Sequence, residues 1–323
     1  MDQPLLRVED LRTYFYTRRG VVKAVDGVSF RVAPGETLGI VGESGSGKTM
    51  TSLSLLRLVP QPGGKIVSGK VLFDGVDLLR LSEAEMRKYR GSQISMILQD
   101  PMASLNPVYT IGEQVAEPLR QHQHLTGTTL WDRAVEALRL LRIPSPRERL
   151  RNYPHQMSGG MRQRVVGGIA ISCVPKLIIA DEPTTALDAT IQAQYLSLLK
   201  DVQRQTNVAI IFVSHDFGVV ARMCDRVAVM YAGKIVESAG IRELFNNPRH
   251  PYTIGLVNSV PRVDRKVERL ASIEGQPPVL LNLPPGCPFA PRCSRVVDRC
   301  RLEEPPAMAV SQEHSAACWK AIA

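Results

Sequence analysis

A glycine-rich octapeptide, Gly42–Thr49 (GESGSGKT), has the residue types and spacing of a phosphate-binding loop. Its glycines allow the backbone to turn tightly enough for N–H groups to face phosphate oxygens. Lys48 would reach the β- and γ-phosphates of a nucleotide, and the Thr49 hydroxyl would bind Mg²⁺. An apolar run before the loop and a helical stretch after it supply the context that separates this motif from a chance match. The residues expected to contact the nucleotide are Gly42, Ser44, Gly45, Ser46, Gly47, Lys48 and Thr49.

Two adjacent carboxylates follow a second apolar run. Leu177–Ala180 is continuously apolar, which is typical of a buried parallel strand, and Asp181 and Glu182 come directly after it. The carboxyl end of such a strand lies beside the phosphate loop in a doubly wound sheet. We therefore expect Asp181 to hold Mg²⁺ through water and Glu182 to polarise the attacking water. The alternative, that these acids only cap the next helix, is disfavoured because Pro183 and Thr184 already begin a turn.

Parallel strands and covering helices must position these side chains. Short apolar runs alternate with helical stretches over residues 1–260, the pattern of an α/β doubly wound fold. Thr37–Val41 and Val208–Val213 are predicted to be buried strands, and Met50–Leu58 the helix after the loop. Val227–Glu237, with Ala-Gly in its middle, is predicted to be a hairpin.

Two further regions differ from this pattern. Trp131–Leu141 carries apolar residues at i, i+3, i+4 and i+7, which predicts an amphipathic helix. A helical subdomain, at about 105–165, is therefore expected to interrupt the sheet domain. Residues 261–323 are proline-rich and irregular and predict a small separate extension.

The bulk composition is that of an ordinary globular protein. Of 323 residues, 44% are hydrophobic and 22% charged, and no apolar run approaches the roughly 20 residues that span a bilayer. The N-terminus lacks a basic-then-apolar signal pattern, so a cytosolic protein is expected. The net charge is +9, but the basic residues are scattered and aromatic residues make up only 5%, which disfavours nucleic acid as a partner.

Four of the six cysteines lie in the proline-rich tail, at Cys287, Cys293, Cys300 and Cys318. In a cytosolic chain such a group indicates a metal before disulfides. The spacings are wider than the C-x2-C pairs of zinc ribbons, and four thiolates in irregular backbone suit an iron–sulfur cluster. A 4Fe–4S cluster is the expectation, with structural zinc or free or oxidised thiols as alternatives. Cys173 and Cys224 lie alone in apolar segments and are expected to be buried bystanders.

With Ser158-Gly159-Gly160 and His215 added, the motif order resembles the ATPase subunits of ABC transporters from Phe15 to about residue 240. In that family the Ser-Gly-Gly segment opens a helix that binds the γ-phosphate of an ATP held by the opposite subunit, and helix-end N–H groups suit such an anion. The resemblance implies the following roles: Gln99 contacts Mg²⁺ and the attacking water, His215 the γ-phosphate, Asp188 the partner subunit, and Phe15 (or Tyr14 or Tyr16) the adenine.

Two residues next to the Ser-Gly-Gly segment, which is the signature segment of the family, limit the resemblance to one branch of it. Met157 and Met161 stand where the general pattern of that family, L-S-G-G-Q, has Leu and Gln. Together with Gln99–Pro107, Asp181–Asp188 and Arg249–Thr253, they resemble the importer ATPases for dipeptides, oligopeptides and nickel. Some members of that branch carry a 4Fe–4S cluster in their C-terminal extension, which agrees with the expectation for the four cysteines.

The resemblance implies an ATP-hydrolysing motor subunit on the cytoplasmic face of the cell membrane, bound peripherally. Its expected partners are a second ABC ATPase subunit (a heterodimer is favoured), two transmembrane permease subunits and, indirectly, an extracytoplasmic substrate-binding protein. Di- or oligopeptides are the expected cargo, with nickel or another small solute as the alternative. A DNA-repair or ribosome-associated ABC ATPase is disfavoured because the interval between phosphate loop and signature holds only a helical subdomain.

Overall fold

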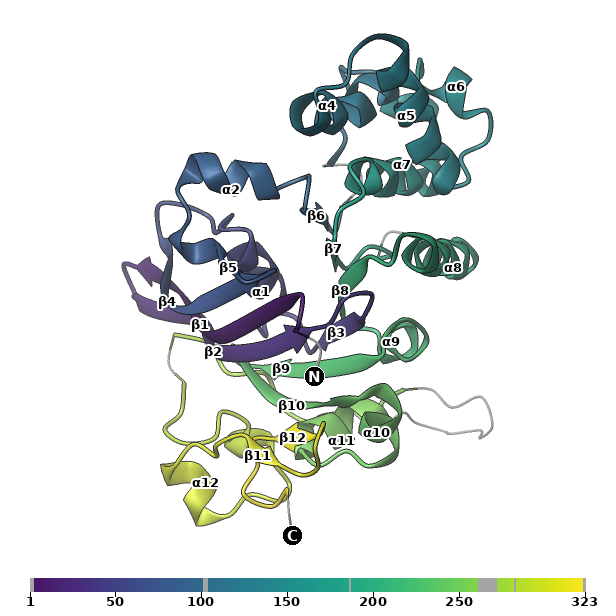
Figure 1. Cartoon of the computed structure of the whole chain (residues 1–323). Coiled ribbons are helices and arrows are strands. Elements are labelled where there is room, and N and C mark those ends of the chain that lie inside the picture. The colour runs from purple at the N-terminus through teal and green to yellow at the C-terminus, as the bar shows by residue number, and fades with distance from the viewer. Residues whose placement is uncertain (1–2, 101–103, 186, 261–271, 282, 322–323) are drawn as a thin grey trace. The chain divides into compact units, whose positions relative to one another are not determined.

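The computed structural model describes residues 3–100, 104–185, 187–260, 272–281 and 283–321. The chain divides into two compact units (Figure 1). The first comprises residues 1–32, 37–79 and 213–323, and the second comprises residues 33–36 and 80–212. The expected divisions at residue 260 and at about 105–165 stay predictions.

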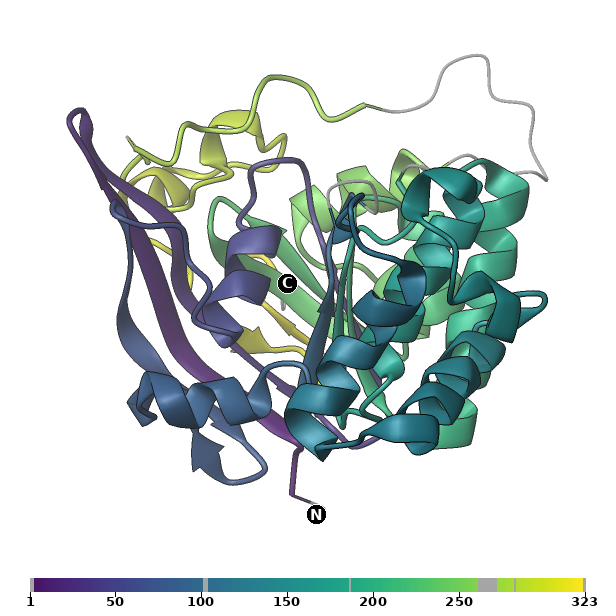
Figure 2. The ribbon, with the colours of Figure 1, turned by 90° about the horizontal axis from the view of Figure 1, so that it is seen from above.

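An antiparallel sheet of four strands forms one layer of the first unit, in the order β2-β1-β4-β5. The two long strands β1 and β2 run side by side, with Leu6 opposite Val32 and Thr17 opposite Gly20 (Figures 1 and 2). Apolar side chains alternate with exposed ones at the start of β1, so one face of the sheet is buried. The strands are β1 (Leu6–Thr17), β2 (Gly20–Val32), β4 (Gly64–Phe73) and β5 (Val76–Asp77).

The second sheet of this unit contains the strand that leads into the phosphate loop. The strands that this unit contributes follow the order β3-β9-β10-β12-β11, with β3 parallel to β9 and the other pairs antiparallel. The strands are β3 (Thr37–Val41), β9 (Arg226–Tyr231), β10 (Lys234–Gly240), β11 (Met308–Ala309) and β12 (Ser315–Ala316). All five residues of β3 are buried, as its apolar sequence predicts. The helices of this unit are α1 (Lys48–Leu55), α9 (Phe217–Met223), α10 (Ile241–Asn246), α11 (Pro251–Asn258) and α12 (Asp298–Leu302).

The predicted hairpin is confirmed. Strands β9 and β10 pair antiparallel through Ala232 and Gly233, both with positive φ (49° and 81°). Two consecutive left-handed residues match the turn to the right-handed twist of the strands, and glycine adopts that conformation without strain.

Parallel strands and long helices make up the second unit. Its strands are β6 (Ile94–Ile97), β7 (Leu177–Asp181) and β8 (Ala209–Ser214), the last of which continues into the first unit. The helices are α2 (Glu83–Tyr89), α4 (Ile111–Gln123), α5 (Gly127–Leu140), α6 (Pro146–Arg149), α7 (Gly159–Ile171) and α8 (Ala189–Thr206). Strand β6 is parallel to β7, and every residue of β7 and β8 is buried. The amphipathic helix predicted at 131–141 coincides with the C-terminal part of α5, whose C-cap is Leu141.

Small elements build the C-terminal extension, which belongs to the first unit. Strand β12 adds to the sheet edge by pairing with β10, and the indole of Trp319 donates a hydrogen bond to Glu303 O (3.3 Å). The Arg299 guanidinium lies 3.5 Å from the centroid of the Trp319 ring system. Backbone pairing thus attaches the extension to the sheet, and contacts such as those of Trp319 join its own segments.

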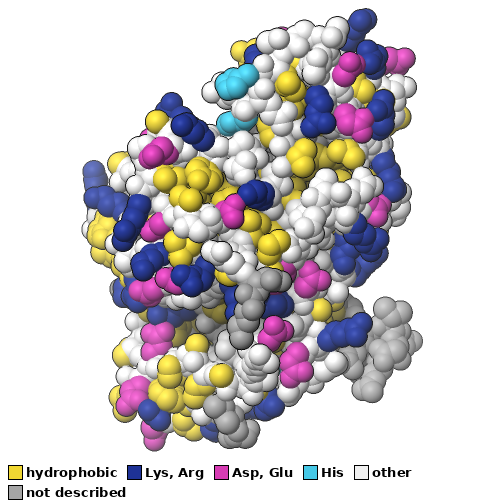
Figure 3. All heavy atoms as spheres, in the orientation of Figure 1, with side chains coloured by type: hydrophobic (Ala, Val, Ile, Leu, Met, Phe, Trp, Pro, Cys, Tyr) yellow, Lys and Arg dark blue, Asp and Glu magenta, His cyan; other side chains and the backbone are white. Residues whose placement is uncertain are grey.

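The surface mixes charges of both signs. On the face shown in Figure 3, Lys and Arg side chains are interspersed with Asp and Glu. Among the described residues, no helix has the length and apolar character required to cross a membrane.

Candidate active site

The loop Gly42–Thr49 connects β3 to α1 in a tight turn. A Cβ atom at Gly42 would lie 2.2 Å from Met230 O, and one at Gly47 would lie 2.3 Å from Ala24 O. Gly47 also has a φ of 105°. Only glycine fits both positions, so the loop lies directly on the backbone of β2 and β9.

Two polar side chains of the loop are drawn inward. Lys48 is buried, and its Nζ donates to the carbonyl oxygens of Gly42 (2.8 Å) and Glu43 (3.0 Å). Ser46 Oγ is buried with no hydrogen-bond partner in the described residues. A buried hydroxyl without a partner is costly, and a phosphate oxygen is a suitable acceptor for it. The loop therefore has the donors that the sequence predicts for a phosphate site.

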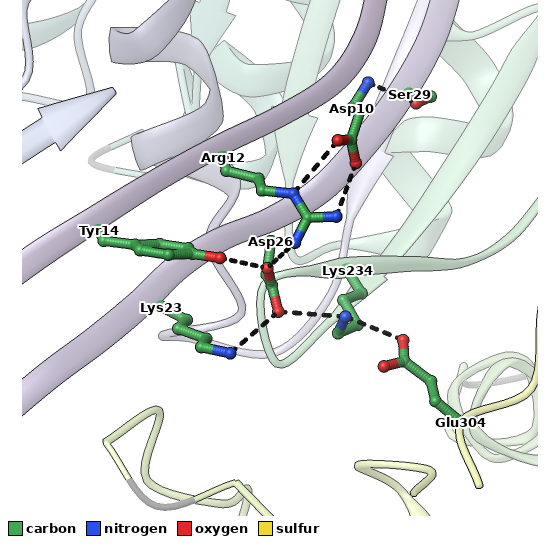
Figure 4. Close-up of polar contacts among 8 residues, drawn as sticks. All are labelled: Asp10, Arg12, Tyr14, Lys23, Asp26, Ser29, Lys234 and Glu304. Carbon is green, nitrogen blue, oxygen red and sulfur yellow. Dashed lines mark hydrogen bonds and ion pairs between the residues drawn. The ribbon is translucent and has the colours of Figure 1, made fainter. Parts of the chain in front are cut away.

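A polar network around Asp26 is connected to the loop (Figure 4). Gly233 N donates to Ser46 O (2.9 Å), and Asp26 N donates to Gly233 O (2.8 Å). The Asp26 carboxylate accepts from the Tyr14 hydroxyl (2.7 Å) and Arg12 Nη1 (3.1 Å) and pairs with Lys234 Nζ (3.1 Å). Lys234 also pairs with Glu304 of the extension (2.9 Å).

Charge compensation keeps Asp26 ionised. Burial by itself would raise the pKa of Asp26, but the Tyr14 hydrogen bond and the charges of Lys234 and Lys23 outweigh it and hold the pKa below its ordinary value. Asp26 thus holds the turn that contacts Ser46, through its backbone N–H on Gly233 and its carboxylate on Lys234.

In the second unit, Gln99 and Glu182 follow the adjacent parallel strands β6 and β7. Gln99 Nε2 donates to Glu182 Oε2 (3.0 Å), and the Thr185 hydroxyl donates to the same oxygen (3.1 Å). Glu182 has a φ of 46°, an uncommon conformation for a non-glycine residue. Asp181, the last residue of β7, is 1% exposed. The structure therefore brings together Gln99 and Glu182, which are 83 positions apart, at the carboxyl ends of two adjacent strands.

The signature segment begins helix α7. Ser158 is the N-cap, and its hydroxyl accepts from Met161 N (3.4 Å). A Cβ at Gly160 would lie 2.9 Å from Ile191 Cγ2 of α8, whereas one at Gly159 would meet nothing within 4 Å in the described residues. Asp188 caps α8 by accepting from the N–H groups of Thr190 and Ile191 (3.1 and 3.0 Å).

The other predicted residues have these positions. His215 is exposed and follows β8, directly before Asp216, the N-cap of α9. Phe15 lies in β1 opposite Val22 of β2 and is half-buried. Thr49 is exposed in the first turn of α1. The assignment of these residues to a nucleotide stays a prediction. The resemblance to ABC transporter ATPases also implies that Gln99 and Asp100–Asn106 pass motion to the permease subunits, and this too stays a prediction; residues 101–103 lie outside the described residues.

The expected 4Fe–4S cluster is wrong, and so is the zinc alternative. The described residues contain no group of three or more His, Cys, Asp or Glu side chains that could hold a metal ion, although all four tail cysteines are described. Cys287, Cys293, Cys300 and Cys318 are free thiols, and burial raises the pKa of Cys287 to about 11. A spacing pattern supplies the number of sulfurs but not the geometry of a metal site, and the backbone bond from Cys287 N to Cys300 O (2.8 Å) holds two of these segments together.

Sequence reasoning missed the contacts of Glu43, the second residue of the phosphate loop. Its carboxylate pairs with Arg292 in the extension, and its N–H donates to the Tyr252 hydroxyl (2.9 Å). The sequence gives only an indirect signal for these contacts: Arg249–Thr253, which contains Tyr252, resembles a segment of the peptide importer ATPases, but this does not predict a contact with Glu43.

Two family models match the chain. Residues 25–185 match the ABC transporter model, and residues 236–300 match the model of the oligopeptide/dipeptide transporter C-terminal region. Among solved structures, the dimeric ATP-binding cassette MJ0796 bound to ADP and Pi is 26% identical, with a TM-score of 0.65, over 73% of this chain and 99% of that one. The expected α/β ABC ATPase fold is confirmed, and the chain belongs to the ATP-binding subunits of ABC transporters.

Curated relatives show which members of the ABC family this chain is similar to in sequence. The probable peptide ABC transporter ATP-binding protein y4tR of Sinorhizobium fredii is 51% identical over 98% of this chain and 95% of its own length. The dipeptide transport ATP-binding protein DppD of Bacillus subtilis is 50% identical over 98% and 95%, and its oligopeptide counterpart OppD is 51% identical over 98% and 88%. Within the ABC family, this chain is one of the members with the oligopeptide/dipeptide transporter C-terminal region.

Proposed function

We propose that this chain is the ATP-hydrolysing motor subunit of an ABC importer for di- or oligopeptides. The observation that carries the proposal is the Gln99–Glu182 pair at the carboxyl ends of two adjacent strands, in a chain that also has a complete phosphate loop. The names of its relatives, which refer to peptide, dipeptide and oligopeptide transport, support peptides as the cargo class.

The loop residues Gly42–Thr49 would bind the phosphates of ATP. Lys48 supplies a positive charge for the β- and γ-phosphates, and the buried Ser46 hydroxyl supplies a hydrogen bond. Phe15 would stack on the adenine.

Oxygen donors suited to Mg²⁺ are present in both units. The Thr49 hydroxyl, the Asp181 carboxylate and the Gln99 amide oxygen are of the type that Mg²⁺ prefers, and they would hold it. Bound Mg²⁺ would neutralise charge on the phosphates.

Glu182 would act as the general base on the attacking water. Gln99 and Thr185 both donate to one of its oxygens, which orients the carboxylate. His215 would donate a hydrogen bond to the γ-phosphate and stabilise the charge on it.

The second half of each site would come from another ATPase subunit. Ser158, Gly159, Gly160 and Met161 open a helix whose N–H groups suit the γ-phosphate of a nucleotide on the opposite subunit, and Asp188 would lie at that contact. Gly159 supports this role because no neighbour within the described residues requires a glycine there. A related but different ATPase chain, two permease subunits and a substrate-binding protein would complete the importer, with this subunit on the cytoplasmic face.

Replacement of the base tests the proposal. Glu182→Gln keeps the shape of the side chain but cannot take a proton, so turnover in the assembled transporter should fall by roughly 100-fold or more. ATP binding should persist, and the ATPase subunits should stay in an ATP-bound closed dimer, visible as a larger species in gel filtration. Glu136→Gln is the matched control; this α5 carboxylate is 43% exposed and pairs with Arg139. Near-normal turnover in Glu182→Gln would remove Glu182 from the role of base.

A further inference from the structure

The phosphate loop is tied to the C-terminal extension through one side chain. Glu43 directly follows Gly42, and its carboxylate receives a bidentate pair from Arg292, with Nη1–Oε2 at 2.7 Å and Nη2–Oε1 at 3.0 Å. The Arg292 side chain is 5% exposed and that of Glu43 is 27% exposed, so this pair is far better shielded than an ordinary surface ion pair.

Every donor direction of the Arg292 guanidinium is used. Besides the two bonds to Glu43, Nη1 donates to the Tyr231 hydroxyl (3.4 Å), Nη2 to Ile273 O (3.3 Å) and Nε to Glu274 O (2.9 Å). Five N–H donors in a fixed plane are a property of arginine alone. Lysine would keep the charge but could not make this set of bonds.

Aromatic rings hold the guanidinium in place. Its central carbon lies 5.8 Å from the Tyr231 ring centroid and 5.9 Å from that of Phe289. Tyr231 and Phe289 pack together with Tyr252, with centroids 4.6 to 5.4 Å apart. Tyr252 is fully buried, and its hydroxyl accepts from Glu43 N (2.9 Å). Glu43 is therefore fixed through both its backbone and its side chain.

The position of Glu43 bears on the phosphate site in two ways. Its carbonyl oxygen accepts from Lys48 Nζ (3.0 Å) and from Ser46 N (3.2 Å), so a shift of Glu43 would move two phosphate-binding residues. Its carboxylate would also be a negative charge beside the triphosphate if Arg292 did not compensate it.

We propose that Arg292 is a positioning residue for the phosphate loop, so that the C-terminal extension sets the affinity of the site for ATP. This inference rests on the proposed function, because it takes Gly42–Thr49 to be the ATP phosphate site. Arg292 acts through Glu43 and makes no contact with the nucleotide in this account. Its effect is on binding and not on the hydrolysis step.

The test measures nucleotide affinity and the two kinetic constants separately. Arg292→Gln should raise the Kd of the full-length chain for ATP about tenfold, since it removes a buried charge-assisted pair. In the assembled transporter the KM for ATP should rise similarly while kcat stays within about twofold. Arg292→Lys should lie between the wild type and Arg292→Gln.

A second substitution separates charge compensation from folding. In Arg292→Gln, the added change Glu43→Gln removes the uncompensated carboxylate, and part of the lost ATP affinity should return. Arg299→Gln is the matched control: it breaks an exposed pair with Glu303 in the same extension and should leave the Kd for ATP unchanged. Circular dichroism and thermal melting identify the folded variants. If Arg292→Gln does not fold, the ATP affinity of Arg292→Lys is compared with that of the wild type instead.

The outcomes are distinct. Wild-type ATP affinity in the folded Arg292 variants overturns the inference, as does an equal loss in Arg299→Gln. A loss confined to kcat also overturns it. If the wild-type chain itself fails to bind ATP, or if Lys48→Ala binds it as well as the wild type, then the proposed function fails instead.

Discussion

Gly159 and Gly160 are neighbours in the first turn of α7, yet their surroundings differ. A Cβ at Gly160 would lie 2.9 Å from Ile191 Cγ2, so packing against α8 favours glycine there. A Cβ at Gly159 would meet nothing within 4 Å in the described part of the chain. The folded subunit alone therefore gives no steric reason for a glycine at 159, and the reason must lie with something that approaches from outside.

This contrast leads to a prediction on Gly159→Ala. The substitution should leave thermal stability unchanged or increase it by up to about 1 kcal/mol, because alanine loses less backbone entropy in a helix. ATP turnover of the assembled transporter should fall by roughly tenfold or more, because the added methyl group would keep the opposite nucleotide away from the helix end. Thermal melting of the isolated chain and steady-state hydrolysis measure the two effects.

Gly160→Ala is the matched comparison. It should lower the melting temperature, because Ile191 must move. A Gly159→Ala protein that is destabilised but fully active would contradict the composite-site proposal at this residue.

At the scale of single elements, helix α11 begins with a buried histidine. His250 is 1% exposed, its ring Nδ1 accepts from Tyr252 N (3.1 Å), and its backbone N–H donates to Glu237 Oε2 (2.8 Å). Burial lowers the pKa of His250 from 6.5 to about 3. The folded chain thus keeps this ring neutral, and an acceptor nitrogen caps the helix.

The stability of the chain should therefore depend on pH through His250. Above about pH 6.5 the ring is neutral in both states and adds no pH dependence, but below it the unfolded chain binds a proton that the folded chain excludes. Stability should fall by up to about 1.4 kcal/mol per pH unit between pH 6.5 and 3 through this residue. His250→Asn retains a capping acceptor without the titration, so its chemical-denaturation free energy should fall less steeply over this range. Equal slopes in the two proteins would contradict this.

Local sequence predicted the elements whose cause is local. The β9–β10 hairpin followed from two apolar runs around Ala232-Gly233, and strand β7 from its uninterrupted apolar residues. Glu182 was expected directly after a strand, but the strand before Gln99 was not predicted; the parallel pairing of β6 with β7 brings the two side chains together. For the hairpin and for β7, the periodicity or the turn chemistry is contained in about ten residues.

Contacts between distant segments could not be predicted in this way. Nothing near Glu43 specifies Arg292, 249 positions later, because the pairing depends on how the extension packs on Tyr231 and Tyr252. The four tail cysteines show the converse error. Their number suggested a cluster, but the described residues, which include all four cysteines, contain no group of side chains that could hold a metal ion, because spacing along the chain does not fix that geometry.

For the whole molecule, the composite-site proposal predicts a stoichiometry. If Lys48 and Ser158 serve different nucleotides, Lys48→Ala should abolish one of the two occluded ATP molecules per ATPase dimer and Ser158→Arg the other. The double variant, made on this chain alone, should retain none. The number of occluded ATP molecules is measured as the nucleotide that remains bound after rapid gel filtration, with each variant also carrying Glu182→Gln.

The alternative gives a different count. If both residues served the same nucleotide, the double variant would retain as much ATP as either single variant. The Ser158→Arg chain should still fold, because Ser158 is exposed, and unchanged circular dichroism checks this.

The order of synthesis gives the Glu43–Arg292 pair another consequence. The ribosome makes the phosphate loop early, but Gly233, Tyr252 and Arg292, which hold it, come much later, and the last follows Glu43 by 249 residues. At about 5–20 residues per second, the completed loop must wait roughly 12–50 s for them. The contacts that hold the loop therefore become available only when almost all of the chain has emerged. A polypeptide released early would contain the full motif and lack the contacts that hold it.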